Sequence, residues 1–346
     1  MRALQLTDPG VLELREVPVP EIGPDELLLR VGAAGICHSD LHVLHLPFTM
    51  RAEPLTLGHE VAGTIEAIGG EVGGRAVGER GIVYLCWSCG VCRECVSGNE
   101  NVCRAAGRTA MPPCPGLGPD GGMAEYIRIP ARSFVPIGEM DFLQAAPLAD
   151  AALTSYHAIH GVRDQLRPGS TAVVIGVGGL GHVAVQILAA VSAARIIAVD
   201  VSEDKLDLAA RCGAAEWLLS GADTAREILD RTDGRGAEAV FDFVGVDQTA
   251  KLAVESVAPN GAYRMVGLGG GAPELTAAPA GGPGWPWGAS VRKSYGGTKS
   301  DLIDSVALAE AGKLRIEVEK YDLADGRDAL DRLERGLVGG RAVLVP

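Results

Sequence analysis

Aromatic residues are scarce in this sequence, at 4% of its 346 positions, and no uninterrupted apolar run reaches the roughly 18 residues of a membrane-spanning helix. A basic stripe with interleaved aromatic residues is also missing, and the formal net charge is −13, so neither a membrane nor nucleic acid is expected as a partner. The N-terminal residues lack a basic segment followed by an apolar one, so we expect no secretory signal peptide and a cytoplasmic location.

The sequence does contain enough apolar material for two domains with sizeable cores. Its length exceeds that of one typical domain, and its hydrophobic content is 47%. In the N-terminal part, turn residues separate short apolar runs, which predicts a β-rich domain. Its strands are expected at Met1–Leu6, Leu12–Val17, Glu26–Val31, Val61–Ile68 and Arg80–Tyr84.

The pattern changes from about residue 141. One helix is expected over Phe142–Gly161, and apolar strands then alternate with helices, which predicts a parallel, doubly wound sheet and an α/β fold class. The expected strands of this sheet are Thr171–Ile175, Arg195–Val199, Ala239–Val244 and Ala262–Val266. Further helices are expected after Leu302, with a last strand at Arg341–Val345.

A glycine-rich fingerprint follows the first strand of this sheet and precedes the predicted helix His182–Val191. It consists of Gly176, Val177, Gly178, Gly179, Leu180 and Gly181. The first glycine permits a tight turn, the second lets the backbone approach a pyrophosphate, and the third packs the helix on the strand. Asp200 ends the next strand, 19 residues after the fingerprint, where its carboxylate can bind both ribose hydroxyls of NAD and would repel the 2′-phosphate of NADP. The fingerprint therefore predicts NAD as the cofactor.

Four of the eight cysteines are closely spaced, at Cys89, Cys92, Cys95 and Cys103. Four thiolates within fifteen residues can surround one tetrahedral ion. The alternatives are an iron–sulfur site and a disulfide framework. The ferredoxin run has a shorter final gap followed by proline, whereas seven residues separate the last two cysteines here and Arg104 follows. Disulfide frameworks are typical of short secreted chains. The spacing therefore predicts a structural zinc site.

A second constellation suggests another metal. It comprises the stretch Cys37–His42, the triplet Gly58–Glu60 and, much later, Asp150. Together with the cysteine lobe, the stretch Asp120–Tyr126, the glycine fingerprint and Asp200, these motifs make the chain resemble the zinc-dependent medium-chain alcohol dehydrogenases over essentially its whole length.

The resemblance implies three protein ligands of a catalytic zinc: Cys37, His59 and Asp150. Many family members have cysteine as the third ligand, and Asp150 in its place resembles the bacterial secondary-alcohol branch. Glu60 resembles a carboxylate that can approach the metal during ligand exchange, and Asp40 one that accepts the free ring N–H of the histidine. Taken singly, the three ligands would also suit a buried thiol, a core histidine and a helix-terminal carboxylate.

The resemblance also implies a proton relay and further cofactor contacts. Ser39 would accept the alcohol proton and pass it through ribose hydroxyls to His42, which could otherwise be a surface histidine in a turn. Arg341 would contact the cofactor phosphates. The other implied cofactor contacts are Thr154, Lys205, Val266, Gly267 and Leu268. Candidate walls of the substrate pocket, which could equally be domain core, are Leu46, Phe48, Leu85, Trp87, Met111 and Leu117.

We therefore expect a homodimeric or homotetrameric enzyme that holds two zinc ions per chain and reversibly oxidises secondary or varied primary alcohols with NAD. Residues 1–150 with 296–346 are predicted to form a GroES-like catalytic domain, and residues 151–295 a Rossmann domain. The alternatives are a polyol or amino-alcohol dehydrogenase of the same superfamily, and a non-catalytic, zinc-stabilised NAD-binding sensor.

Overall fold

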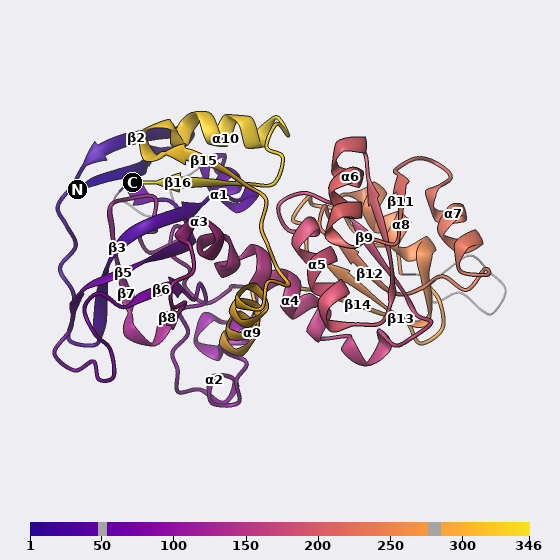
Figure 1. Cartoon of the computed structure of the whole chain (residues 1–346), viewed down its shortest axis with the longest axis horizontal. Coiled ribbons are helices and arrows are strands. Elements are labelled where there is room, and N and C mark those ends of the chain that lie inside the picture. Colours follow the sequence, from indigo (N-terminus) through magenta and orange to yellow (C-terminus); the bar gives the residue numbers. More distant parts are fainter. Residues whose placement is uncertain (48–53, 276–284) are drawn as a thin grey trace. The chain divides into compact units, whose positions relative to one another are not determined.

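The structure is a computed structural model that describes residues 1–47, 54–275 and 285–346. The chain forms two compact units (Figure 1). Unit 1 comprises Met1–Leu153, Gly296–Glu310 and Arg315–Pro346, and unit 2 comprises Thr154–Tyr295 and Ala311–Leu314. Phe48, one of the candidate pocket walls, lies outside the described residues.

Unit 1 is built on a largely antiparallel sheet in which, among the described residues, the strand order is β15-β16-β3-β5-β6-β8, with β7 also paired to β3. A smaller sheet has the order β2-β1-β4. The strands are β1 Arg2–Asp8, β2 Val11–Glu16, β3 Glu26–Gly35, β4 Leu55–Thr56, β5 Glu60–Ile68, β6 Arg80–Val83, β7 Tyr126–Pro130, β8 Phe134–Pro136, β15 Val318–Asp322 and β16 Arg341–Val345. The helices are α1 His38–Leu44, α2 Arg93–Val96, α3 Phe142–Ala145, α9 Lys299–Glu310 and α10 Gly326–Glu334.

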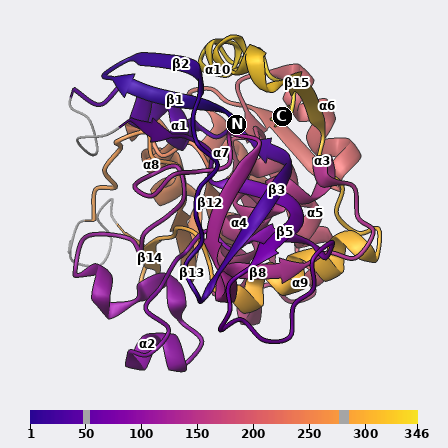
Figure 2. The ribbon, with the colours of Figure 1, turned by 90° about the vertical axis from the view of Figure 1, so that its left-hand side faces the viewer.

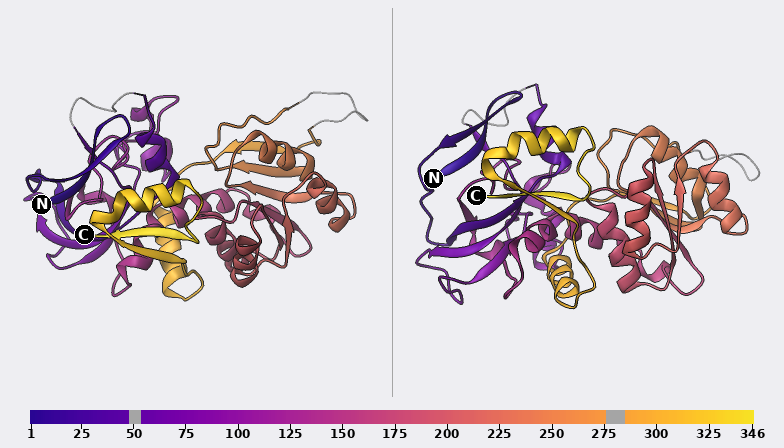
Figure 3. Two further views of the ribbon diagram at one scale, coloured as in Figure 1. Left: turned by 90° about the horizontal axis from the view of Figure 1, so that it is seen from above. Right: turned by 45° about the horizontal axis from the view of Figure 1, so that its top comes forward.

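The C-terminal strand β16 lies beside the N-terminal part of the chain (Figure 3). It pairs antiparallel with β3, so that Val343 faces Gly35 and Leu344 faces Ala34. Most β3 side chains are buried, because the apolar residues of this strand pack into the core of unit 1. The pairing brings the last residues of the chain to the segment that follows β3.

Unit 2 contains a parallel sheet, and its order within the described residues is β11-β10-β9-β12-β13-β14. The strands are β9 Thr171–Ile175, β10 Arg195–Asp200, β11 Glu216–Leu219, β12 Ala237–Asp242, β13 Val257–Met265 and β14 Ser290–Lys293. The helices are α5 Gly181–Val191, α6 Glu203–Cys212, α7 Thr224–Arg231 and α8 Asp247–Ser256. The strand order reverses between β9 and β12, which is where doubly wound sheets bind ligands. The predicted doubly wound parallel sheet is confirmed.

The helix predicted over Phe142–Gly161 is wrong as a single element. The structure has α3, then a 3₁₀ turn at Ala146–Ala149, then α4 at Ala151–His160. Pro147 has no backbone N–H to donate, which disfavours a continuous α-helix at this point. Asp150 lies between the turn and α4 with φ of −127°, outside the helical range. Its carboxylate is therefore not constrained to the direction that a side chain of a continuous helix would have.

In the part of the chain that the structure describes, no helix has both the length and the apolar character needed to cross a membrane.

Candidate active site

The first group of site residues lies at the start of α1, directly after β3. Cys37 is the residue before the helix, and its backbone N–H donates to Asp40 Oδ2 at 2.8 Å. This capping contact holds the carboxylate of Asp40, which is fully buried, under the first turn. Ser39 Oγ lies 3.7 Å from Cys37 Sγ, and His42 is exposed on the same helix.

The second group comes from the start of β5. His59 is 2% exposed and Glu60 is fully buried. Glu60 faces Gly35 in the antiparallel ladder, and a Cβ atom on that glycine would collide with the carboxylate of Glu60. Glycine at this position therefore makes room for a buried acid beside the strand that leads to Cys37.

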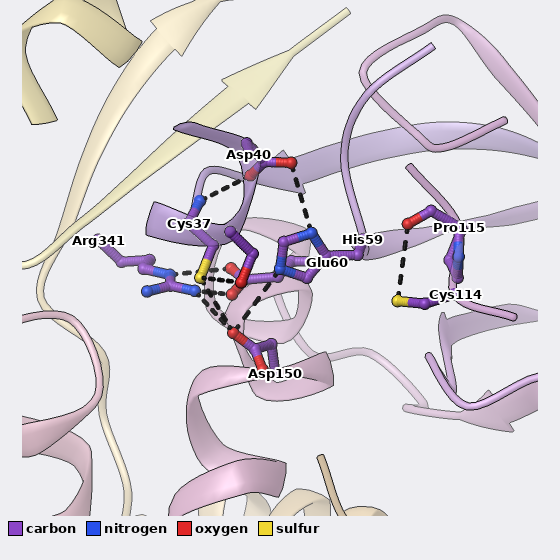
Figure 4. A network of polar contacts seen from close by, with 9 residues as sticks. Cys37, Asp40, His59, Glu60, Cys114, Pro115, Asp150 and Arg341 are labelled. Carbon is purple, nitrogen blue, oxygen red and sulfur yellow. Dashed lines mark hydrogen bonds and ion pairs between the residues drawn. The ribbon is translucent and has the colours of Figure 1, made fainter. Parts of the chain in front are cut away.

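Asp150 brings these groups together (Figure 4). Its Oδ2 lies 3.3 Å from Cys37 Sγ and 3.8 Å from His59 Nε2. The ligand atoms of Cys37, His59, Glu60 and Asp150 all lie within 4.8 Å of one another. The other ring nitrogen of the histidine, Nδ1, lies 3.4 Å from Asp40 Oδ1, and neither of these two buried atoms has a hydrogen-bond partner at normal distance among the described residues. A small ion among the four groups would draw them closer, which makes the set suitable for a metal.

Arg341 at the start of β16 completes this cluster. It is 3% exposed and donates to Glu60 through both Nε, at 3.0 Å, and Nη2. Nη2 also donates to Asp150 Oδ2 at 3.1 Å. Sequence reasoning did not find this arginine–carboxylate contact, since 281 residues separate Arg341 from Glu60 and no local motif signals it. The contact with cofactor phosphates stays a prediction for this residue.

The charges around His59 and Cys37 shift both pKa values. Burial opposes a charged imidazole, but the carboxylates of Asp40 and Asp150 outweigh it and raise the pKa of His59 well above its usual value. Burial also opposes a thiolate, but Arg341, together with His59, outweighs it and lowers the pKa of Cys37. The cluster thus combines the side chains of a cysteine, two acids and a histidine in a buried position, a donor set that suits zinc.

Two further buried thiols lie in unit 1 outside both predicted zinc sets. Burial raises the pKa of Cys86 to about 12 and raises that of Cys114 as well. Both therefore remain protonated thiols near neutral pH, in the class of inert buried cysteines.

The four-cysteine lobe around α2 extends away from the sheets of unit 1 (Figure 2). Cys92 Sγ lies 3.4 Å from Cys95 Sγ and 4.0 Å from Cys103 Sγ, and Cys89 Sγ lies 3.9 Å from Cys95 Sγ. Zn–S bonds of about 2.3 Å in a regular tetrahedron place sulfur atoms about 3.8 Å apart. The sulfur positions therefore fit a single zinc ion.

In unit 2 the glycine fingerprint has the backbone that its residues predict. Gly176 adopts a φ of +85°, which disfavours other residues. A Cβ atom on Gly181 would collide with the carbonyl of Gly176, whereas a Cβ atom on Gly178 would meet nothing within 4 Å. The second glycine therefore leaves open space where a pyrophosphate would approach, and the third allows close packing.

Asp200 lies at the end of β10 beside this turn. Its Oδ2 accepts from the backbone N–H of Val177 at 2.7 Å, and Oδ1 accepts from that of Ser202 at 3.1 Å. These contacts hold the carboxylate at the turn, and both Gly176 and Asp200 line a cavity of about 560 Å³. Lining residues that sequence reasoning missed include Ser220, Val244, Val246, Gln248 and Lys251. They follow β11 and β12, and a signal for them was available, because ligands bind at the carboxyl ends of parallel strands.

The remaining predicted cofactor residues do not line this cavity. Thr154 is buried on α4, and Lys205 is half-buried on α6. Val266 and Gly267 donate their backbone N–H groups to the carbonyl of Asp242, and the neighbouring Leu268 is 50% exposed. Of the candidate pocket walls, Trp87 and Leu117 pack on the core of unit 1, Leu85 is buried, Leu46 is half-buried and Met111 is exposed.

Comparison with known proteins identifies both parts of the chain. Residues 23–139 match the alcohol dehydrogenase GroES-like domain, and residues 179–311 match the zinc-binding dehydrogenase domain. An NAD-dependent alcohol dehydrogenase of Sulfurisphaera tokodaii is 36% identical over 365 aligned residues that cover 100% of both chains. D-arabinose 1-dehydrogenase (NADP(+)) of Saccharolobus solfataricus is 33% identical, over 97% of this chain and 94% of that protein.

Among solved structures, the alcohol dehydrogenase of Aeropyrum pernix superposes with a TM-score of 0.90 at 34% identity and covers 100% of both chains. The matched domains account for the GroES-like fold predicted for the β-rich part of the chain. With relatives this similar over the full length, the chain belongs to the zinc-dependent medium-chain alcohol dehydrogenase family.

Proposed function

We propose that this protein is an NAD-dependent zinc alcohol dehydrogenase that reversibly oxidises secondary or varied primary alcohols to ketones or aldehydes. The observation that carries the proposal is the meeting of Cys37, His59 and Asp150 in one buried cluster of unit 1. The family supports the same activity, since several full-length relatives are named NAD-dependent alcohol dehydrogenases. Unit 1 would be the catalytic domain and unit 2 the cofactor domain.

The chain would hold two zinc ions with different roles. The structural ion would be bound by Cys89, Cys92, Cys95 and Cys103. The catalytic ion would be bound by Cys37, His59 and Asp150, which leaves one position open for substrate. When bound, this zinc supplies the Lewis acidity that eases loss of the alcohol proton, and NAD accepts the hydride.

Asp150 is the proposed third ligand in preference to Glu60. Its Oδ2 faces both Cys37 Sγ and His59 Nε2. Arg341 engages both oxygens of Glu60, and it also donates to Asp150 Oδ2, so either acid would have to give up a contact with the guanidinium to bind a metal. The position of Asp150 Oδ2 between Cys37 and His59 is what favours Asp150. Glu60 therefore suits a carboxylate that approaches the metal only during ligand exchange, and Arg341 orients both acids.

Proton removal would use the two polar residues of α1. Ser39, close to Cys37, would accept the alcohol proton, and His42 would release it to solvent, with the bound cofactor's ribose lying between the two. The exposure of His42 supports its place as the last member, because the proton must leave to solvent. Asp40 would fix the tautomer of His59 by accepting from Nδ1.

The cofactor would bind in unit 2 at the fingerprint and at Asp200. The open space at Gly178 and the orientation of the Asp200 carboxylate support NAD. Thr154, Lys205, Val266, Gly267, Leu268 and Arg341 are proposed as further cofactor contacts. A cytoplasmic homodimer or homotetramer remains our prediction.

The related D-arabinose 1-dehydrogenase favours one alternative within the same chemistry, a polyol or sugar substrate. The two substrate classes can be distinguished by assaying zinc-replete enzyme with a panel of primary, secondary and poly-alcohols and measuring NADH formation by its absorbance. Turnover of simple secondary alcohols with kcat/KM at least about tenfold above that of polyols would support the proposal, tenfold corresponding to about 1.4 kcal/mol of transition-state binding. No NADH from any alcohol, with both zinc ions present, would favour a non-catalytic sensor.

A further inference from the structure

Two arginines lie side by side in unit 2, away from the cofactor cavity. The strands β13 and β14 are neighbours in the sheet (Figure 1). Arg264 on β13 and Arg292 on β14 are partners in their parallel ladder, so their side chains project from the same face of the sheet. Tyr263, the neighbour of Arg264, projects from the opposite face into the core cluster that contains Leu252 of α8. Neither β13 nor β14 contributes a residue to the lining of the cofactor cavity.

Arg264 is buried, and no residue that the structure describes gives it an anionic partner. It is 7% exposed, and its Nε has no hydrogen-bond partner among the described residues. Its Nη1 donates only a long hydrogen bond, 3.4 Å, to the carbonyl of Tyr263. Burial, reinforced by the charge of Arg292, lowers the pKa of Arg264 to about 10. An unpaired buried charge is costly, and neighbouring like charge adds to the cost.

The residues around Arg264 and Arg292 do not neutralise the two positive charges. Arg292 is exposed, so the pair opens to solvent on its side. A Cβ atom built on Gly161, just after α4, would lie 3.7 Å from Arg292 Nη1 and 3.6 Å from the carbonyl oxygen of His157. The helix end thus offers partial negative charge to Arg292. Within the described residues, no salt bridge joins either arginine to a carboxylate.

We propose that Arg264 and Arg292 form a binding site for a free oxyanion of the phosphate or carboxylate class. A guanidinium presents a planar fork of N–H donors that matches such an anion, and two adjacent forks can hold it from two sides. The anion would supply the acceptor that Arg264 Nε lacks and would offset the repulsion between the two charges. Entry would be from the exposed side of Arg292.

Inorganic phosphate is the probe that tests the proposal. The thermal midpoint of the zinc-loaded protein is followed against phosphate concentration in a buffer low in chloride, with and without saturating NAD. We expect a saturable rise for the wild type that persists with NAD, because NAD occupies the other phosphate-binding region. Arg264→Leu and Arg292→Ala should each weaken the apparent phosphate affinity by about tenfold or more, since charge-assisted hydrogen bonds are lost.

Controls separate a site from general salt effects and from poor folding. Arg226→Leu removes an exposed arginine of unit 2 that pairs with Asp223, and it should keep the wild-type response. Without phosphate, Arg264→Leu should be at least as stable as the wild type, because it removes an unpaired buried charge. Arg292 is exposed, so its alanine variant tests the site without disturbing the core.

An equal response of wild type, Arg264→Leu and Arg292→Ala to phosphate would overturn the proposal. So would a rise without saturation, which is the general effect of phosphate on burial. A third result would also overturn it: no phosphate response together with a change in oligomeric state on Arg264→Leu, measured by sedimentation, would assign the arginines to a carboxylate of a second copy of this chain.

Discussion

Arg341 engages both carboxylate oxygens of Glu60, although the two residues lie 281 positions apart. The same guanidinium also donates to Asp150 Oδ2, which is the carboxylate oxygen that faces both Cys37 and His59. One guanidinium therefore orients both candidate acids for the third zinc position, and only Asp150 also has an oxygen close to both Cys37 and His59.

This geometry predicts opposite results for the two acids. Asp150→Ala should retain one zinc per chain, in the cysteine lobe, and lose nearly all turnover while NAD still binds. Asp150→Asn should weaken the metal less, although a neutral amide is a poor zinc ligand. Glu60→Gln, the matched control, should retain two zinc ions. Metal analysis of the purified variants reads the outcome, and two zinc ions in Asp150→Ala would make Glu60 the third ligand instead.

The cysteine lobe should govern stability more than chemistry. Cys92→Ser should lose the structural zinc and lower Tm on the order of 10 °C, because metal binding contributes folding energy and each kcal/mol lost lowers Tm by about 2–4 °C at this size. The kcat of molecules that remain folded should change much less. The control is Cys212→Ser, because this cysteine lies on α6 of unit 2, outside the cysteine lobe. Equal Tm values for the two serine variants would argue against a metal in the lobe.

Asp200 should decide between the two cofactors. Replacing it with glycine and placing arginine at Val201 should raise the ratio of NADP to NAD kcat/KM by about tenfold or more, because repulsion of the 2′-phosphate is replaced by attraction. Asp207→Gly removes an exposed acid from the adjacent helix and should leave the ratio unchanged. If the wild type already uses both cofactors equally, the carboxylate is not the discriminator.

His42→Gln should slow alcohol oxidation mainly below about pH 8, by about 10²-fold at most, where the missing base is needed most. Added buffer bases should partly restore the rate. The matched control is His45→Gln, since this histidine lies just after the same helix but pairs with Glu334 at 2.9 Å. Identical pH–rate profiles for wild type and His42→Gln would show that His42 is a surface histidine without a role in proton transfer.

Zinc affinity of the catalytic site should fall as pH falls. Zinc binds neutral imidazole, whereas the raised pKa of His59 favours the protonated ring in the metal-free protein, so we expect binding to release a proton. One released proton weakens binding by up to about tenfold per unit decrease of pH. Asp40→Asn removes a carboxylate that raises this pKa and should reduce the pH slope, while costing about 10–100-fold in affinity.

Chelator competition on protein with the structural zinc in place measures both quantities. The prediction fails if Asp40→Asn has the wild-type slope, because His59 would then not be the group that releases the proton.

The sequence-based predictions were most accurate for elements that are specified by residues close together in the sequence. The strand Thr171–Ile175 and the last strand, Arg341–Val345, were predicted with their observed bounds, because apolar runs flanked by turn residues specify them locally. The break before Asp150 was missed, since the apolar pattern of 142–161 continues across it and only Pro147 indicates a stop. The Glu60–Arg341 contact could not be predicted, because it depends on β16 pairing with β3 rather than on any motif.

That pairing constrains how the protein is made. Almost all of unit 2 lies between Thr154 and Tyr295, whereas unit 1 needs β16, which is synthesised after unit 2. During translation the parallel sheet of unit 2 can therefore form on the ribosome before the proposed metal cluster is complete, and Arg341 reaches Glu60 only after unit 2 has been synthesised. Until then, the acids and thiols of unit 1 are present in the nascent chain without the guanidinium that balances them, a stage at which premature metal capture would compete with folding.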